Sequence, residues 1–403
     1  MKKKTTAGLI FLGLALCLTA GLAACKSVVP EKPAPPHHHT PGAWEFDEVN
    51  HFRFCTGCGA IRDRGKHTYQ HENAVDEDCI VCYHKPVSEN LAYTLSADGS
   101  FYSVSVGACT DEKIVIPSAH EDLPVKEIVA TGFHEQYEIT EVTLPHSMTK
   151  IGNRAFYNCY NLVTVDLGEH AVSIGSEAFT GCSALEGISI PNSVTSIGEA
   201  AFRSCESLEE ITIPSSVTSL GKNAFYGAGL QRATVGRGIT AISEGAFAEC
   251  ASLTQITLPN TIKSVGASAF EDCVRLGAIA LPSGVERIGE AAFKGCNQLV
   301  SVTLPSSLTQ IDKSAFRSCG MLAQVSIPSA ITVIEEYTFY ECNALTTIVF
   351  PASLQRVKAH AFHGCTILTN VNYRGSQSKW DEVVIEEDNA YLDSLIPNSD
   401  YKD

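Results

Sequence analysis

Basic residues are in the minority in this chain of 403 residues, with 29 Lys and Arg against 45 Asp and Glu and a formal charge of −16. A protein that binds nucleic acid needs a basic face, so this balance disfavours nucleic acid as a partner. After Leu22, no apolar run reaches the ~18 residues needed to cross a bilayer. The chain also lacks a Gly-rich phosphate loop, a nucleophile elbow and a recurring acidic partner for its histidines. Together, these absences argue against an enzyme.

The segment 1–24 has the layout of an export signal. Lys2, Lys3 and Lys4 precede an apolar run, which ends in Leu22-Ala23-Ala24-Cys25. This tetrapeptide resembles the lipobox of bacterial lipoproteins, and the resemblance implies that Cys25 is lipidated and becomes the first mature residue. An ordinary cleaved signal or an uncleaved anchor is the alternative. We expect a surface-exposed protein outside the cytoplasmic membrane, held to the bacterial cell membrane by acyl chains on Cys25.

A proline-rich segment follows the signal and, with the lipidated cysteine, covers residues 25–43. Five prolines fall within twelve positions, at Pro30, Pro33, Pro35, Pro36 and Pro41. Such a run favours an extended, hydrated polyproline II conformation. We therefore expect a semi-rigid tether between the anchor and the first folded module.

Residues 44–86 contain two CxxC pairs, formed by Cys55, Cys58, Cys79 and Cys82. This spacing lets two thiolates of each pair reach one ion, so we expect a structural Zn²⁺ with four thiolate ligands, or with His67 as the alternate ligand. Two disulfides are the open alternative, because an exported chain meets oxidising conditions. With Trp44, His51 and the His67-Thr68-Tyr69 step, the pairs resemble Cys- and His-rich modules of surface proteins in anaerobic Gram-positive bacteria, and the resemblance implies a structural role.

A phenylalanine recurs through the rest of the chain, at Phe133, Phe156, Phe179, Phe202, Phe225, Phe247, Phe270, Phe293, Phe316, Phe339 and Phe362. The numbering advances by 23 in nine of the ten gaps and by 22 in the other, which gives eleven repeats between about residue 114 and residue 373. One unit reads Leu185-x-x-Ile188-x-Ile190-Pro191-x-x-Val194-x-x-Ile197-Gly198-x-x-Ala201-Phe202-x-x-Cys205. A unit this small cannot bury its apolar groups alone, so we expect the units to stack as coils.

Each part of the unit predicts a local structure. Ile188 and Ile190 alternate with polar residues, which indicates a short strand with one buried face. We expect Gly198 to adopt a backbone conformation that other residues resist. Ala201 and Phe202 are expected to pack inward from a short helical or 3₁₀ arc. Strands of successive coils should pair in parallel at ~4.8 Å.

The repeated motif closely resembles the BspA-type leucine-rich repeat, found in surface proteins of bacteria and some protists. The resemblance covers about two thirds of the chain. It implies a leucine-rich-repeat solenoid of stacked short parallel strands, turns and short helical arcs, preceded by the Cys/His-rich module. We expect an N-terminal cap over residues 87–117, the solenoid over 118–372, and a C-terminal cap and tail over 373–403. The resemblance also implies adhesion to surface proteins of host or neighbouring cells, including matrix components.

Nine cysteines stand three residues after a repeat phenylalanine and must stack in a column: Cys159, Cys182, Cys205, Cys250, Cys273, Cys296, Cys319, Cys342 and Cys365. Stacked side chains point the same way, and Ala228 takes this place in one unit. We therefore expect buried thiols that donate to loop carbonyls. The unit with Ala228 is one residue short and replaces the proline turn by Gly236-Arg237-Gly238. A local binding notch and a tolerated deletion are the alternatives, and we favour the deletion.

The outward strand positions are small and polar, and they are nearly free of the aromatic residues and Arg that dominate binding hot spots. This face suits weak, multivalent contacts. Tyrosines lie near the Phe–Cys arc instead, so Tyr157, Tyr226 and Tyr340 are candidates for a binding surface at that edge. We expect an adhesive surface protein. The alternative is a structural spacer or envelope coat that projects the Cys/His module without binding.

Overall fold

The computed structural model describes residues 44–46, 50–54, 61–66, 87–389, 392 and 397–402. The first three segments are strands β1 (Trp44–Phe46), β2 (Asn50–Phe54) and β3 (Ile61–Lys66). They pair in the order β1-β2-β3, and both pairs are antiparallel. This small sheet belongs to one compact unit, and the rest of the described chain forms another.

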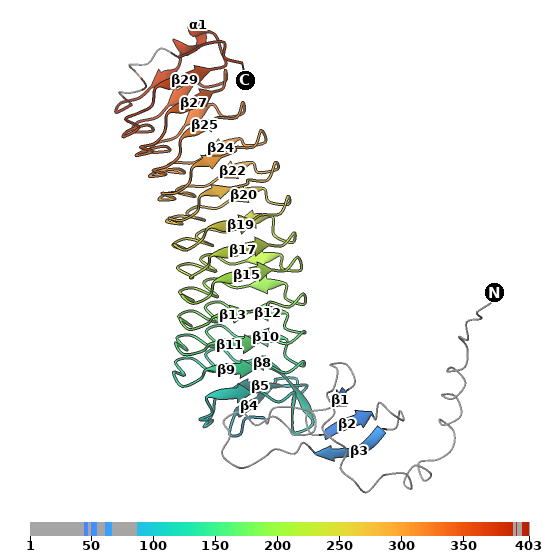
Figure 1. Cartoon of the computed structure of the whole chain (residues 1–403). Coiled ribbons are helices and arrows are strands. Elements are labelled where there is room, and N and C mark those ends of the chain that lie inside the picture. The colour runs from blue at the N-terminus through green and yellow to red at the C-terminus, as the bar shows by residue number, and fades with distance from the viewer. Residues whose placement is uncertain are drawn as a thin grey trace, which may run out of the picture. The chain divides into compact units, whose positions relative to one another are not determined.

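The larger unit is a stack of coils built around two columns of short parallel strands (Figure 1). We number the coils 1 to 11 by their phenylalanine, from Phe133 in coil 1 to Phe362 in coil 11. The first column contains β6 (Lys113–Val115), β9 (Glu141–Thr143), β11 (Thr164–Asp166), β13 (Gly187–Ile188), β15 (Glu210–Ile213), β17 (Arg232–Val235), β19 (Gln255–Thr257), β21 (Ala278–Ile279), β23 (Ser301–Val302), β25 (Gln324–Ser326), β27 (Thr347–Phe350) and β29 (Asn370–Tyr373).

The second column contains β8 (Leu123–Ile128), β10 (Lys150–Ile151), β12 (Ser173–Ile174), β14 (Ser196–Ile197), β16 (Ser219–Leu220), β18 (Ala241–Ile242), β20 (Ser264–Val265), β22 (Arg287–Ile288), β24 (Gln310–Ile311), β26 (Val333–Ile334), β28 (Arg356–Val357) and β30 (Val384–Ile385). The sequence did not indicate these strands, because most of them are two residues long and too short to show an alternating pattern.

The strand pairing confirms the predicted solenoid. Val165 of β11 pairs with Val142 of β9 on one side and Ile188 of β13 on the other, so the register advances by one repeat unit per coil. Within β15 the residues alternate between exposed and buried, and Ile211 and Ile213 face the core. Short parallel strands therefore stack in register, each with one face in a continuous apolar core.

The phenylalanines form an unbroken stack inside the coils. All eleven rings are fully buried. Neighbouring ring centroids lie 5.3 to 5.6 Å apart, with interplanar angles between 3° and 19°. Stacked aromatic rings at this spacing add to the energy of burial alone.

The predicted helical or 3₁₀ arc around each phenylalanine is wrong. The chain there runs through successive turns, and the residues two before and two after the ring have positive φ in most coils. In coil 4 these residues are Ala200 at φ 51° and Ser204 at φ 55°. Two left-handed residues per coil break any helix and fold the arc tightly around the ring.

The reason predicted for Gly198 is also wrong. This glycine does not have positive φ. A Cβ on it would instead lie 2.5 Å from the carbonyl carbon of Gly175 in the preceding coil. Glycine is required because neighbouring coils approach too closely for a side chain.

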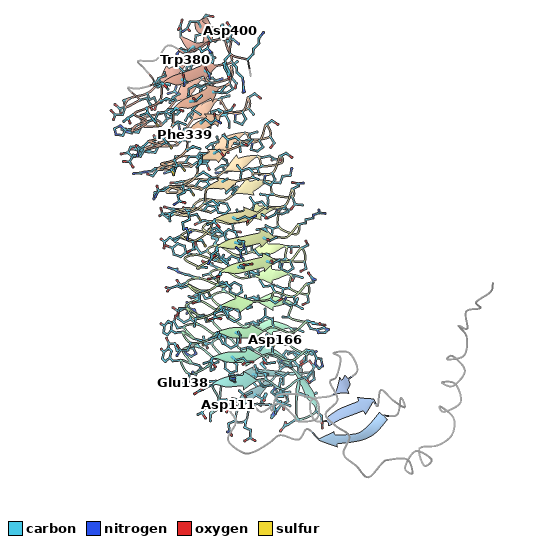
Figure 2. The ribbon with its side chains drawn as sticks, in the orientation of Figure 1. Asp111, Glu138, Asp166, Phe339, Trp380 and Asp400 are labelled. Carbon is cyan, nitrogen blue, oxygen red and sulfur yellow. The ribbon has the colours of Figure 1, made fainter. Side chains whose placement is uncertain are left out.

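Both ends of the core are covered. At the N-terminal end, β4 (Ala92–Leu95) and β5 (Tyr102–Ser105) form an antiparallel hairpin, β5 pairs in parallel with β8, and β7 (Ala119–His120) pairs with β8. At the other end, the short helix α1 (Gln377–Trp380) presents the buried Trp380 to Tyr373 and Phe350, with ring centroids 5.3 and 5.7 Å apart. Trp380 lies near the C-terminal end in Figure 2.

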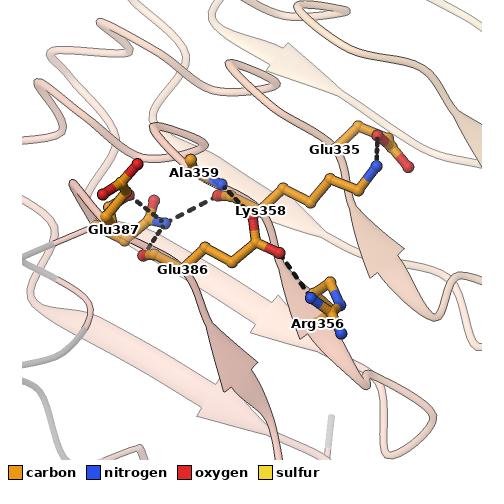
Figure 3. A network of polar contacts seen from close by, with 7 residues as sticks. Glu335, Arg356, Lys358, Ala359, Glu386 and Glu387 are labelled. Carbon is orange, nitrogen blue, oxygen red and sulfur yellow. Dashed lines mark hydrogen bonds and ion pairs between the residues drawn. The ribbon is translucent and has the colours of Figure 1, made fainter.

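A polar network fixes the C-terminal cap to the last coils (Figure 3). Glu386 accepts a hydrogen bond from Arg356 at 2.7 Å and one from the Ala359 amide at 3.1 Å. Asn389 donates to the Lys358 carbonyl at 2.9 Å, and Lys358 pairs with Glu335 at 2.7 Å. These bonds satisfy backbone groups that an open last coil would leave unpaired.

Candidate functional site

The face of the first strand column is polar and contains one broad hollow. Its outward residues, such as Asp166, Gln255 and Gln324, are exposed as predicted. The hollow has a volume of about 1390 Å³ and extends over β13, β15, β17 and β19. Gly187 contributes to it, because the space where a Cβ would stand is open. No aromatic side chain lines this hollow.

Coil 5, which carries the one-residue deletion, lines part of this hollow, and glycines stand where it approaches coil 4 most closely. A Cβ on Gly236 would lie 2.5 Å from the carbonyl carbon of Pro214 in coil 4, and a Cβ on Gly229 would overlap the carbonyl oxygen of Glu206. Coils 4 and 5 therefore approach so closely at both turns that only glycine fits. The side chain of Arg237, between the two turn glycines, is exposed at the hollow.

The turn edge is the surface formed by the residues around each buried phenylalanine, and it presents aromatic and basic side chains. All three tyrosines expected there are half-buried. The Arg154 guanidinium lies 5.5 Å from the Tyr157 ring, and the Arg203 guanidinium lies 4.8 Å from the Tyr226 ring. The Tyr226 hydroxyl also donates to Glu249, so this residue is held on two sides.

Tyr340 belongs to a larger group, which we name the C-terminal aromatic cluster: Arg317, Tyr337, Tyr340, His360 and His363. His360 stacks on Tyr337 with centroids 5.0 Å apart, and His363 stacks on Tyr340 with centroids 5.1 Å apart. The Arg317 guanidinium lies 4.7 Å from the Tyr340 ring and 5.6 Å from the Tyr337 ring. Arg317 makes no ion pair with the described residues.

Sequence reasoning named Tyr340 but missed this cluster. Both histidines follow a tyrosine by one repeat unit, from Tyr337 to His360 and from Tyr340 to His363. Residues with that separation stack in neighbouring coils. This separation was the signal for the cluster, and an alignment of the repeats in columns would have shown it.

The cysteine column is buried, as predicted. All nine thiols are free, and each donates to the carbonyl of the phenylalanine one coil earlier, at 3.0 to 3.2 Å. Burial raises the pKa of Cys159, Cys250 and Cys365 to about 12. A thiol with so high a pKa is not a nucleophile at neutral pH. The column is therefore part of the core.

Several predicted site residues lie outside the described residues. These are the lipidation site Cys25 and the expected zinc ligands Cys55, Cys58, Cys79 and Cys82, with the alternate His67. Within the part of the chain that the structure describes, no three His, Cys, Asp or Glu residues form a group that could hold a metal ion. No helix among those residues is long and apolar enough to cross a membrane.

Comparison with known proteins identifies the repeats. A family model described as the BspA type leucine rich repeat region matches in six copies, over residues 126–251, 172–286 and 265–389. Repeats of this kind are typically non-enzymatic, and proteins that contain them commonly bind other proteins. No curated protein matches the chain.

The chain is also similar to solved structures of leucine-rich repeat proteins. A leucine-rich repeat protein from Bacteroides ovatus is 27% identical, with a TM-score of 0.64 over 75% of this chain and 79% of its own. A leucine rich cell surface protein from Faecalibacterium prausnitzii is 28% identical over 74% of this chain and 97% of its own, with a TM-score of 0.42. The family model matches more than half of this chain, and the matched residues form stacked coils. This chain therefore belongs to the BspA-type leucine-rich repeat family.

Proposed function

We propose that this protein is a lipid-anchored bacterial surface adhesin whose solenoid binds proteins on host or neighbouring cells, matrix components included. The lipobox-like end at Cys25 supports export and anchoring. Membership of a family that commonly binds proteins supports the role of the solenoid. The acidic composition disfavours nucleic acid as the partner.

The C-terminal aromatic cluster is the observation that carries this proposal. Tyr and Arg are the residue types that dominate protein-binding hot spots. Here Arg317, Tyr337 and Tyr340 are half-buried, and His363 is exposed. The outward strand face offers small polar side chains instead. The turn edge is therefore the better surface for a protein partner.

The cluster is also held in place before a partner arrives. Each histidine lies flat on a tyrosine, and Arg317 contacts both tyrosine rings. His360 is further fixed by Asp388, with Nδ1 and Oδ2 3.1 Å apart. Side chains that are already ordered lose less rotamer entropy on binding, which favours affinity.

Bead adhesion separates an adhesin from the alternative, a structural spacer. The core formed by the described residues from 87 onward is covered at both ends, so a fragment of residues 87–403 should fold by itself. We expect beads coated with this fragment to attach to cultured epithelial cells, and trypsin treatment of the cells to remove the attachment. Attachment by residues 26–86 alone, with none by residues 87–403, would show that the solenoid is a spacer.

We further propose that residues 44–86 bind one structural Zn²⁺ through Cys55, Cys58, Cys79 and Cys82, with His67 as the alternate ligand. Two CxxC pairs supply the four soft ligands that zinc prefers. On mature protein purified without oxygen, we expect about one zinc per chain. The double change Cys55→Ser and Cys79→Ser should remove it. Fourteen cysteines follow Cys25, so a metal-free protein with four fewer free thiols would mean two disulfides instead.

A further inference from the structure

A second hollow lies on the turn edge, several coils away from the C-terminal aromatic cluster. It has a volume of about 670 Å³ and spans coils 2, 3 and 4, with Asn223 of coil 5 also in its lining. Tyr157 and Tyr160 of coil 2 form one wall, and Arg203 and Glu206 of coil 4 form the other. Neither the family match nor the proposed adhesion assigns it a role.

The hollow exists because coil 3 has small side chains where its neighbours have large ones. At the position one residue after the phenylalanine, coils 2, 3 and 4 have Tyr157, Thr180 and Arg203. At the position four residues after the phenylalanine, they have Tyr160, Ser183 and Glu206. The small side chains of coil 3 leave a gap between the large side chains of coils 2 and 4. This gap is two coil spacings wide, and each spacing is 5.3 Å along the phenylalanine stack. A sugar ring stacks about 4 Å from an aromatic face, so the gap holds one pyranose.

Tyr160 offers that gap an open aromatic face. Its ring stacks on Tyr137, with centroids 5.5 Å apart and an interplanar angle of 6°. The stack ends there, because coil 3 has Ser183 in this column. Tyr160 is 46% exposed and lines the hollow, whereas Tyr137 does not line it. The negative face of an aromatic ring attracts the weakly positive C–H groups of a sugar ring.

Planar polar groups around the ring can bind sugar hydroxyls. Within the described residues, the Glu206 carboxylate and the Asn158 amide make no side-chain hydrogen bond, and Arg203 makes no ion pair. Glu177 differs, because Arg154 donates to both of its oxygens at 3.0 and 2.9 Å. A carboxylate, an amide and a guanidinium each present paired donors or acceptors, which match two adjacent hydroxyls.

We propose that this notch binds a neutral hexose residue of a glycan, stacked on Tyr160 and hydrogen-bonded by Asn158, Arg203 and Glu206. Acidic sugars are disfavoured, because the notch is lined by a single basic residue and by three carboxylates, those of Glu177, Glu199 and Glu206. The notch is separate from the C-terminal aromatic cluster, since the two share no residue. An adhesin of this form would recognise a glycoprotein through both protein and sugar.

The test is saturation-transfer difference NMR on the mature, unlipidated chain. The probes are lactose, maltotriose, cellotriose, mannotriose and chitotriose at millimolar concentration, with sialyllactose as the acidic comparison. We expect transfer to the C–H protons of at least one neutral probe, and at least tenfold weaker binding after Tyr160→Ala. The double change Thr180→Tyr and Ser183→Tyr continues the tyrosine columns into the gap, and should block binding while the protein stays folded.

The matched control is Tyr340→Ala, which removes a tyrosine from the other end of the same edge and should leave sugar binding unchanged. Transfer to none of the neutral probes overturns the proposal. So does preferential binding of sialyllactose, or neutral binding that survives both notch variants. If residues 87–403 do not attach to cells but the chain binds a neutral sugar, only the proposal of protein adhesion fails. The two proposals can therefore be overturned separately.

Discussion

At the scale of single residues, close approach between coils decides which side chains are allowed. Gly198 has ordinary φ, yet a Cβ there would meet the backbone of the preceding coil. Gly187 stands in β13 with open space where its Cβ would be. The same amino acid is therefore required at one position and replaceable at the other, and the difference is steric.

Gly198→Ala should destabilise the solenoid by about 1–3 kcal/mol, because the added methyl forces two backbones apart. Gly187→Ala is the matched control and should change stability by less than about 1 kcal/mol, with a small gain expected from reduced unfolded-state entropy. Urea unfolding of both variants measures the change in the free energy of unfolding. Equal losses in the two variants would show that glycine acts through backbone flexibility instead.

The buried thiols make stability depend on alkaline pH. Burial holds the pKa of Cys250 and Cys365 at about 12, whereas an unfolded thiol ionises near pH 8.5. The folded form therefore keeps protons that the unfolded form has lost. Each thiol contributes its full stability below about pH 8.5, and this contribution is lost as the pH rises towards 12.

Urea unfolding at pH 8 and pH 10 tests this linkage. Wild type should lose stability over that range, and the double variant Cys250→Ala and Cys365→Ala should lose less, by about 1–2 kcal/mol for each thiol removed. Alanine is a suitable replacement, because Ala228 already occupies this column in coil 5. An identical loss in both proteins would mean that these thiols ionise in the folded state.

At the scale of the coil, apolar burial outweighs surface charge. Each coil places a fully buried phenylalanine on the ring of the coil before it. Ion pairs also join neighbouring coils, as between Lys222 and Glu244 or Arg154 and Glu177, but three of these four side chains are more than half exposed and Glu177 is 31% exposed. Exposed pairs add little to stability. The aromatic stack therefore couples one coil to the next more strongly than these ion pairs do.

Phe247→Ala should cost about 3–5 kcal/mol, because it leaves a cavity in the middle of the stack. Since coils contact only their neighbours, the damage should stay local. Hydrogen exchange should rise in β17, β19 and β21 and change little in β9 and β11. A uniform rise along all the coils would contradict nearest-neighbour coupling.

At the scale of the whole molecule, the sequence predicts the architecture better than the surface. The regular spacing of residues such as Phe179 and Phe202 was enough to infer stacked parallel coils, because a repeating apolar pattern permits few other ways to bury itself. The second strand column was missed, because two-residue strands such as β14 carry no period. The turns around Phe202 were predicted as helical, because nothing about Ala200 or Ser204 indicates a left-handed conformation.

Surface features depend on what stands one coil away. Tyr340 was a candidate from its position alone, but its contacts with His363 and Arg317 exist only once the coils are stacked. The notch beside Tyr160 is likewise produced by the small Ser183 in the next coil. A single repeat unit contains neither feature, so both emerge only from the assembled solenoid.

The most direct test of the proposed adhesion is cell attachment by residues 87–403 carrying Arg317→Ala and Tyr340→Ala. The control carries Thr257→Ala and Gln324→Ala, two exposed changes on the strand face. If the turn edge binds the partner, the first variant should attach at least tenfold less than wild type, as expected when a hot spot is removed, and the control should match wild type. Full attachment by the cluster variant, with loss in the strand-face variant, would contradict the account.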